Sequence, residues 1–167
     1  MNHSSLITSA STIFILLFAQ ALHARSPIDP GTACSFLNED HFRGSMEYSR
    51  KKSGYYNCSS LRKPINKGEP TGSDIRYEVR GTESEVTGIL LHLRMRSHRI
   101  SIPVLKEFHR NSETLYQKVF NKSLPEEISI AITSAIRGEW AMDGYKIQLN
   151  RLHDNAMTYE LIFSIEK

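Results

Sequence analysis

The fold is decided by the stretch 75–96, which has the sequence IRYEVRGTESEVTGILLHLRMR. Apolar and charged side chains alternate over 75–80, a period of two that predicts a strand with one buried face. After a polar turn at 81–85, the alternation resumes over 86–96, where His92 and two arginines share the polar side. Two strands joined by a short turn predict an antiparallel hairpin with one face in the core and one in water.

The hydrophobic period changes downstream of this hairpin. Apolar residues recur at spacings of three and four over 105–119, which predicts a helix, and Pro103 suits its first turn. A second helix is predicted to begin in the stretch 123–126, SLPE, which is a capping box with a proline in the first turn. Its end is predicted by Arg137 in the last turn and Gly138 as the C-cap.

Two further stretches with a period of two, 145–150 and 159–166, predict two more strands, connected through 152–156. The expected fold class is therefore α+β. It is a two-layer sandwich of order β-β-α-α-β-β, in which a four-stranded antiparallel sheet carries two helices on one face. A disulfide-clipped, loop-rich segment over 34–73 is expected to precede the sandwich. Within this segment, the proline- and glycine-rich stretch 61–73 predicts a loop.

The N-terminal segment has the properties of an export signal. Residues 6–18 are apolar or small, and no Asp, Glu, Lys or Arg precedes Arg25. This run is closer in length to a signal-peptide core than to the ~20 residues of a membrane span. We expect a signal peptide over 1–24, cleaved after Ala21 or Ala24, because small residues stand at both positions. An uncleaved anchor is the alternative, since the first residues contain no Lys or Arg.

The remainder, 25–167, has the size of a single domain and is long enough to bury a core without metals. Its net charge of +3 is mildly basic and does not require a nucleic-acid partner. We expect the protein in the periplasm, if the source is a Gram-negative bacterium, or outside the cell. We expect no nucleic-acid partner and no membrane span after cleavage.

The chain has two cysteines, Cys34 and Cys58. An even pair in an oxidising compartment indicates a disulfide. Closing the polar loop between them would stabilise the fold by about 3 kcal/mol. A metal pair or a reactive thiol is the alternative, but no further soft ligand lies near them in the sequence.

Two stretches, 54–60 (GYYNCSS) and 75–82 (IRYEVRGT), resemble a pattern in small exported bacterial proteins of unknown function. The resemblance covers most of the mature chain. It implies export and an α+β domain, and it carries no activity and no catalytic residues.

Common catalytic and cofactor motifs are missing from the sequence. It contains no Walker loop, G-x-G-x-x-G, H-E-x-x-H, C-x-x-C or G-x-S-x-G pattern. His92 and His98 flank an arginine cluster that would repel a metal cation, and His109 is expected at the edge of a helix. We therefore expect no metal and no cofactor. A site that combines His92, His98 or His153 with a carboxylate remains the route to an enzyme.

The polar face of the sheet is the best candidate for a binding surface. Strand alternation places on it six basic side chains: Arg76, Arg80, His92, Arg94, Arg96 and Lys146. Arginine forks suit carboxylate or phosphate groups of a partner. Leu90 and Ile162 interrupt the polar pattern, as a contact surface would. The alternative is an ordinary solvated face with cross-strand charge pairs.

These features favour a non-enzymatic exported binding protein. The expected partner is another envelope or extracellular protein, or an anionic ligand, held by the arginine-rich sheet face. The alternative function is a small secreted hydrolase with a histidine–carboxylate site.

Overall fold

The structure is a computed structural model that describes residues 28–42, 47–65, 72–96, 101–155 and 158–167, with the backbone alone for 153–155. The predicted signal peptide, its two cleavage positions and His98 lie outside the described residues, and so does the side chain of His153.

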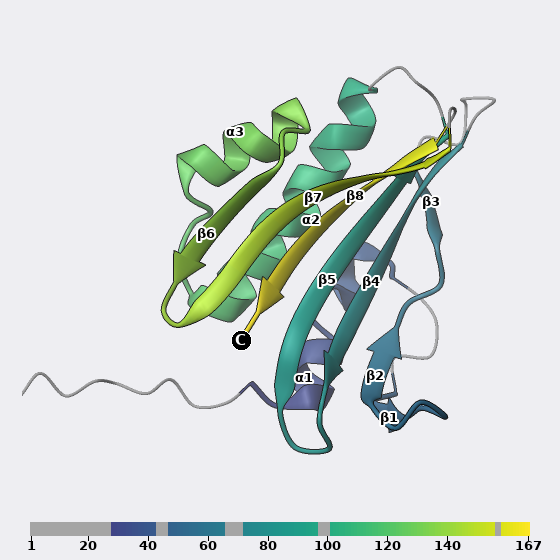
Figure 1. The fold of residues 1–167 in the computed structure, drawn as a ribbon, viewed down its shortest axis with the longest axis vertical. Coiled ribbons are helices and arrows are strands. Elements are labelled where there is room, and N and C mark those ends of the chain that lie inside the picture. The colour runs from purple at the N-terminus through teal and green to yellow at the C-terminus, as the bar shows by residue number, and fades with distance from the viewer. Residues whose placement is uncertain (1–27, 43–46, 66–71, 97–100, 156–157) are drawn as a thin grey trace, which may run out of the picture.

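One antiparallel sheet of eight strands dominates the described part of the chain (Figure 1). In spatial order, the main path contains β1 (Ser49–Arg50), β2 (Tyr56–Ser59), β4 (Ser73–Gly81), β5 (Val86–Met95), β8 (Thr158–Glu166), β7 (Tyr145–Asn155) and β6 (Gly138–Met142). The short strand β3 (Lys63–Ile65) pairs with the first residues of β4, whereas β2 pairs with its last residues. The long strands β4, β5, β8 and β7 form the centre of the sheet.

Helices cover one face of this sheet and leave the other without a described helix (Figure 1). They are α1 (Pro30–Cys34), α2 (Ile102–Phe120), α3 (Glu126–Ser134) and a short 3₁₀ turn, η1 (Asn38–Asp40). The core lies between the layers, where Tyr77, Leu91 and Phe163 of the sheet and Phe108 of α2 are fully buried. In the described ranges, no helix is both long and apolar enough to cross a membrane.

The predicted four-stranded sheet with two helices is wrong, because the structure has eight strands and three α-helices among its described residues. Three of the additional strands, β1, β2 and β3, come from the segment predicted to be loop-rich. They are two to four residues long, which is too short for an alternating pattern to be visible. Pairing with β4 and with each other makes them strands.

The fourth additional strand, β6, follows a helix boundary that was also predicted wrongly. α3 ends at Ser134, and Ala135 adopts a left-handed conformation with a φ of 52°. The amides of Ala135 and Ile136 donate to carbonyls in the last turn of α3, which is a Schellman cap. Gly138 is therefore free to begin β6. At the other end of α3, Pro125 occupies the N-cap without a side-chain hydrogen bond, so the predicted capping box does not form.

A tight turn joins β6 to β7. Asp143 and Gly144 both have positive φ, 50° and 81°, which is the type I′ geometry preferred in two-residue hairpins. Glycine is suited to this position because it adopts a positive φ without steric cost. The dipeptide sequence was therefore a local signal for the strand that precedes it.

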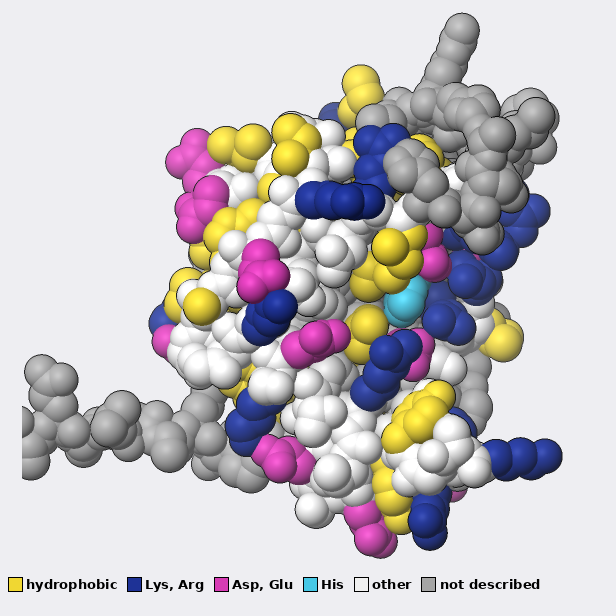
Figure 2. All heavy atoms as spheres, viewed as in Figure 1, with side chains coloured by type: hydrophobic (Ala, Val, Ile, Leu, Met, Phe, Trp, Pro, Cys, Tyr) yellow, Lys and Arg dark blue, Asp and Glu magenta, His cyan; other side chains and the backbone are white. Residues whose placement is uncertain are grey.

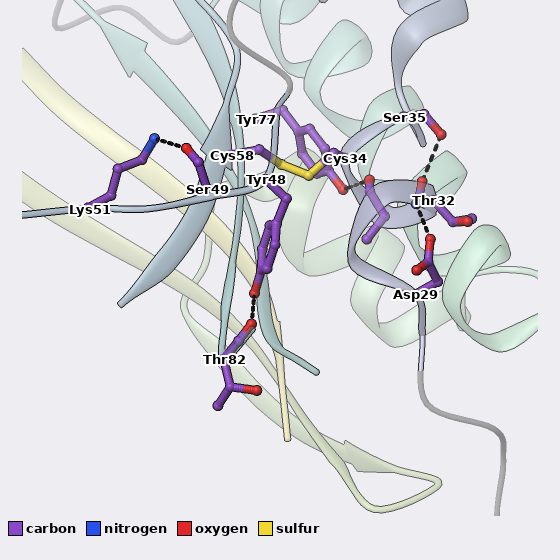
Figure 3. The surroundings of a disulfide bond; sticks show 11 residues. Asp29, Thr32, Cys34, Ser35, Tyr48, Ser49, Lys51, Cys58, Tyr77 and Thr82 are labelled. Atoms are coloured by element: carbon purple, nitrogen blue, oxygen red, sulfur yellow. Dashed lines mark hydrogen bonds between the residues drawn. A yellow bond between two sulfur atoms is a disulfide. The ribbon is translucent and has the colours of Figure 1, made fainter. Parts of the chain in front are cut away.

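The predicted disulfide is confirmed. Cys34 and Cys58 are bonded with their Cα atoms 6.1 Å apart, and both are buried. The bond joins the end of α1 to β2, as Figure 3 shows. Close to it, the buried hydroxyl of Tyr77 in β4 donates a 2.7 Å hydrogen bond to the carbonyl of Ala33. The N-terminal segment is thus attached to the sheet by a covalent bond and by a buried polar contact.

Candidate functional site

The open face of the sheet, which no described helix covers, collects charged side chains from three adjacent strands. Asp74 of β4 lies opposite Arg94 of β5, and Arg94 in turn lies opposite Glu160 of β8. Arg76 lies opposite His92 in the same way. Because alternate side chains of a strand share a face, these groups all project to the open side. Figure 2 shows Lys and Arg side chains gathered over the β4–β5 side of this face.

The first group of charges, the Asp74 cluster, consists of Asp74, Arg62, Arg94 and Arg96. Arg62 donates to Oδ1 of Asp74 at 2.7 Å, and Arg94 donates to Oδ2 through Nε at 3.1 Å and Nη2 at 2.6 Å. Arg96 Nη2 lies 3.6 Å from Oδ2, too far for a hydrogen bond. Asp74 is only 7 % exposed, whereas Arg96 remains half exposed. Three guanidinium groups therefore surround one buried carboxylate.

The second group, the Glu78 cluster, consists of Glu78, Arg76, Arg80 and His92. Arg80 Nε donates to Glu78 Oε1 at 2.6 Å, and Arg76 Nη2 donates to Oε2 at 3.1 Å. Burial of Glu78 acts to raise its pKa, but the hydrogen bond and charge of Arg80, together with the charges of Arg76 and His92, hold the pKa below its ordinary value. Glu78 is therefore a buried, ionised carboxylate.

His92 connects the two clusters. Its ring is only 6 % exposed, with Nε2 at 3.7 Å from Glu78 Oε2 and Nδ1 at 3.4 Å from Glu160 Oε1. Glu160 also lies 3.6 Å from Arg62 of the Asp74 cluster. The contact with His92 lowers the pKa of Glu160 against the effect of burial, and Arg62 lowers it further. A chain of polar contacts thus runs across the face from Arg80 to Arg62 and on to Asp74.

Glu78 and Glu160 make the free energy of unfolding depend on pH in the acid range. The pKa values of Glu78 and Glu160 are lowered in the folded state. Their ionised carboxylates therefore stabilise the fold above the unfolded pKa of about 4.3, and this stabilisation is lost as the pH falls from there through the lower folded pKa. The urea midpoint is expected to be lower at pH 3 than at pH 7. In the double variant Glu78→Gln/Glu160→Gln, the urea midpoint should fall less between pH 7 and pH 3 than it does in wild type.

The matched control for this pH prediction is Glu113→Gln, which removes an exposed carboxylate on α2 that has no ion pair with a described residue. It should keep the wild-type pH dependence. A wild-type midpoint that does not change between pH 7 and pH 3 would contradict the assignment of Glu78 and Glu160 as stabilising ionised groups.

The structure brings five of the six predicted binding residues together and separates the sixth. The five are Arg76, Arg80, His92, Arg94 and Arg96. Lys146 lies on β7, with β8 between it and β5, where its Nζ contacts the exposed Glu139 at 3.1 Å. The predicted apolar contact pair is not exposed as expected, because Leu90 is buried and Ile162 is partly buried.

Sequence reasoning missed Arg62, which contacts both Asp74 and Glu160. It lies immediately before β3, in the stretch predicted as a loop, where no alternation assigns a residue to a face. The pairing of β3 with β4 brings this part of the chain beside Asp74. Its role depends on a contact between distant parts of the sequence, so no local signal could have identified it.

A serine–histidine pair lies elsewhere in the fold, between α2 and α3. His109 Nε2 of α2 lies 2.7 Å from Ser129 Oγ of α3, a distance suited to a nucleophile and its base. No described carboxylate is bonded to His109, and the amide of Ser129 donates to the Pro125 carbonyl within its own helix. Among the described residues the pair therefore has no orienting acid, and its contact joins the two helices.

The described residues also contain no group of three or more His, Cys, Asp or Glu side chains arranged to hold a metal ion. Comparison of the chain with known proteins finds no matching family model, no matching curated protein and no matching solved structure. What the protein does must therefore be inferred from its own residues.

Proposed function

We propose that the protein is an exported, non-enzymatic binding protein that holds an acidic segment of a partner protein on the open face of its sheet. The observation that carries this proposal is the charge balance of the two clusters. Five arginines, Arg62, Arg76, Arg80, Arg94 and Arg96, share three carboxylates, Asp74, Glu78 and Glu160. These eight residues therefore keep an excess of positive charge even with His92 left out of the count.

The arginines are held in place before a partner arrives. Arg62, Arg76, Arg80 and Arg94 each hydrogen-bond to a buried carboxylate of the face, yet their side chains remain about one third to one half exposed. An ordered guanidinium loses little conformational freedom when it binds an anion, which favours affinity. Carboxylates are the matching groups, because a guanidinium fork donates two parallel hydrogen bonds to them.

The proposed compartment follows from the disulfide and the N-terminal sequence. A buried disulfide such as Cys34–Cys58 is typical of proteins in oxidising compartments, which agrees with the predicted signal peptide. We place the protein in the periplasm or outside the cell on that basis. In either place an acidic protein is a more available partner than nucleic acid. The hydrolase alternative would use His92, which lies between the carboxylates of Glu78 and Glu160. It has less support, because the His92 ring is nearly inaccessible to solvent and so is poorly placed to reach a substrate.

The test of this function measures binding of a fluorescent oligoglutamate peptide to the mature, oxidised protein by anisotropy. Wild type should bind it in preference to an oligoglutamine peptide of the same length, and added salt should weaken binding. Arg80→Glu/Arg96→Glu, which reverses the two most exposed arginines of the face, should lower the affinity by about tenfold or more.

The control variant is Lys106→Glu/Lys118→Glu, which makes the same change in net charge on the exposed side of α2. It should leave the affinity within about twofold of wild type, because these lysines lie on the helical layer. Equal losses in the two variants would mean that net charge alone attracts the peptide, and would overturn the proposal. Equal binding of oligoglutamate and oligoglutamine by wild type would overturn it as well.

A further inference from the structure

We infer that the Asp74 cluster is the subsite where a carboxylate of the partner binds, an inference that rests on the proposed function. The first reason is the local charge. Three guanidinium groups converge on Asp74, and the only other described acid in contact with them, Glu160, is shared with His92. The Glu78 cluster has only two arginines for its carboxylate. With Glu160 and His92 left out of both counts, the Asp74 cluster therefore carries three guanidinium groups for one carboxylate, against two for one at the Glu78 cluster.

The second reason is the distribution of hydrogen bonds. Oδ1 of Asp74 accepts from Arg62, and Oδ2 accepts two N–H groups of Arg94. Both oxygens are thus engaged, and Arg96 makes no hydrogen bond to a described residue. A guanidinium carries five N–H donors, and that of Arg96 is half exposed. In the Glu78 cluster, by contrast, both arginines donate to the carboxylate.

The arrangement of Arg94 and Arg96 defines what this subsite can hold. Arg94 lies near the end of β5 and Arg96 directly follows its last residue, and the side chains of both reach Oδ2 of Asp74. Arg94 is fixed by its two bonds to Asp74, and Arg96 is available to move onto a ligand. A carboxylate placed against them would accept hydrogen bonds from Arg96. It would also neutralise positive charge of the three guanidinium groups that Asp74 alone does not neutralise. The ligand group is therefore an aspartate or glutamate side chain of the partner.

The experiment compares two matched neutralising variants in the oligoglutamate assay. Arg94→Gln/Arg96→Gln removes two charges from the Asp74 cluster, and Arg76→Gln/Arg80→Gln removes two from the Glu78 cluster. We expect the first to lower the affinity by about tenfold and the second by less than about threefold. The single variant Arg96→Gln breaks no hydrogen bond to a described residue, so it should keep the fold and still lower the affinity by about threefold.

The outcomes separate this inference from the proposed function. If wild type prefers oligoglutamate but the Arg76/Arg80 variant loses as much affinity as the Arg94/Arg96 variant, the subsite is wrong and the function stands. An unchanged affinity of Arg96→Gln also overturns the subsite. If wild type shows no preference for oligoglutamate, the function itself fails. Inorganic phosphate that displaces the peptide where acetate at equal ionic strength does not would replace the carboxylate assignment with a phosphate site.

Discussion

Replacing Cys34 and Cys58 together by alanine is expected to lower the free energy of unfolding by about 3 kcal/mol. The bond closes a loop with a sequence separation of 24, and its loss gives the unfolded chain more conformational freedom. The segment it holds contains only short elements, such as the five-residue α1 and the four-residue β2, which would not form on their own. Urea unfolding followed by far-ultraviolet circular dichroism measures the change.

Reduction provides the control for this prediction. Dithiothreitol should destabilise wild type by an amount similar to the double alanine variant and should leave that variant unchanged. Both cysteines are buried, so alanine is preferred to serine, which would bring an unpaired hydroxyl into the core. A loss smaller than about 1 kcal/mol would show that the sheet pairings of β2 and β3 hold the segment without the bond.

Asp74→Ala is expected to lower the free energy of unfolding by about 2 kcal/mol. The carboxylate is nearly inaccessible to solvent and accepts hydrogen bonds from Arg62 and Arg94. Without it, these two guanidiniums and that of Arg96 repel one another across a small region. Because the arginines are one third to one half exposed, water offsets part of the cost, and the expected value is below that of a fully buried pair.

A double-mutant cycle tests the cause of that loss. Adding Arg94→Ala to Asp74→Ala should cost less than the sum of the two single changes, because the first substitution has already removed their interaction. Glu139→Ala, which breaks the exposed pair with Lys146, should leave the urea midpoint unchanged. Strictly additive effects of Asp74→Ala and Arg94→Ala would contradict the assigned ion pair.

The long strands and the first long helix were predictable because their residues repeat a pattern for several turns or pleats. The alternation from Ile75 to Arg80 lies within β4, and Ile75 and Tyr77 are fully buried as predicted. The spacing over 105–119 lies within α2. The disulfide was predictable from the even number of cysteines and the predicted export signal. In each case a local or compositional rule was sufficient.

The short strands were not predictable from periodicity. β1, β2 and β3 contain too few residues to show it. β2 and β3 form against β4, and β1 forms against β2. The missed strand β6 is a different case. The Asp143–Gly144 dipeptide is a strong hairpin signal and, with the alternating side chains of β7, would have predicted a partner strand.

Burial on the open face also differed from the expectation of a uniformly exposed polar surface. Alternation placed His92 and Leu90 on the correct side of β5, but both are buried. Glutamate and arginine side chains of β4 and β8 lie beside the ring of His92. Strand alternation assigns a face to a residue, whereas its exposure depends on the length and charge of the neighbours across the sheet.

The sequence by itself determined the strand and helix faces, the disulfide partners and the presence of arginines on one side of the sheet. These properties follow from local periodicity and from residue counts. Only the tertiary structure decided which charges meet: Arg62 reaches Asp74 and Glu160, and His92 lies between Glu78 and Glu160. Ion pairs depend on distances of a few ångströms between residues far apart in the chain, and those distances exist only after the strands have paired.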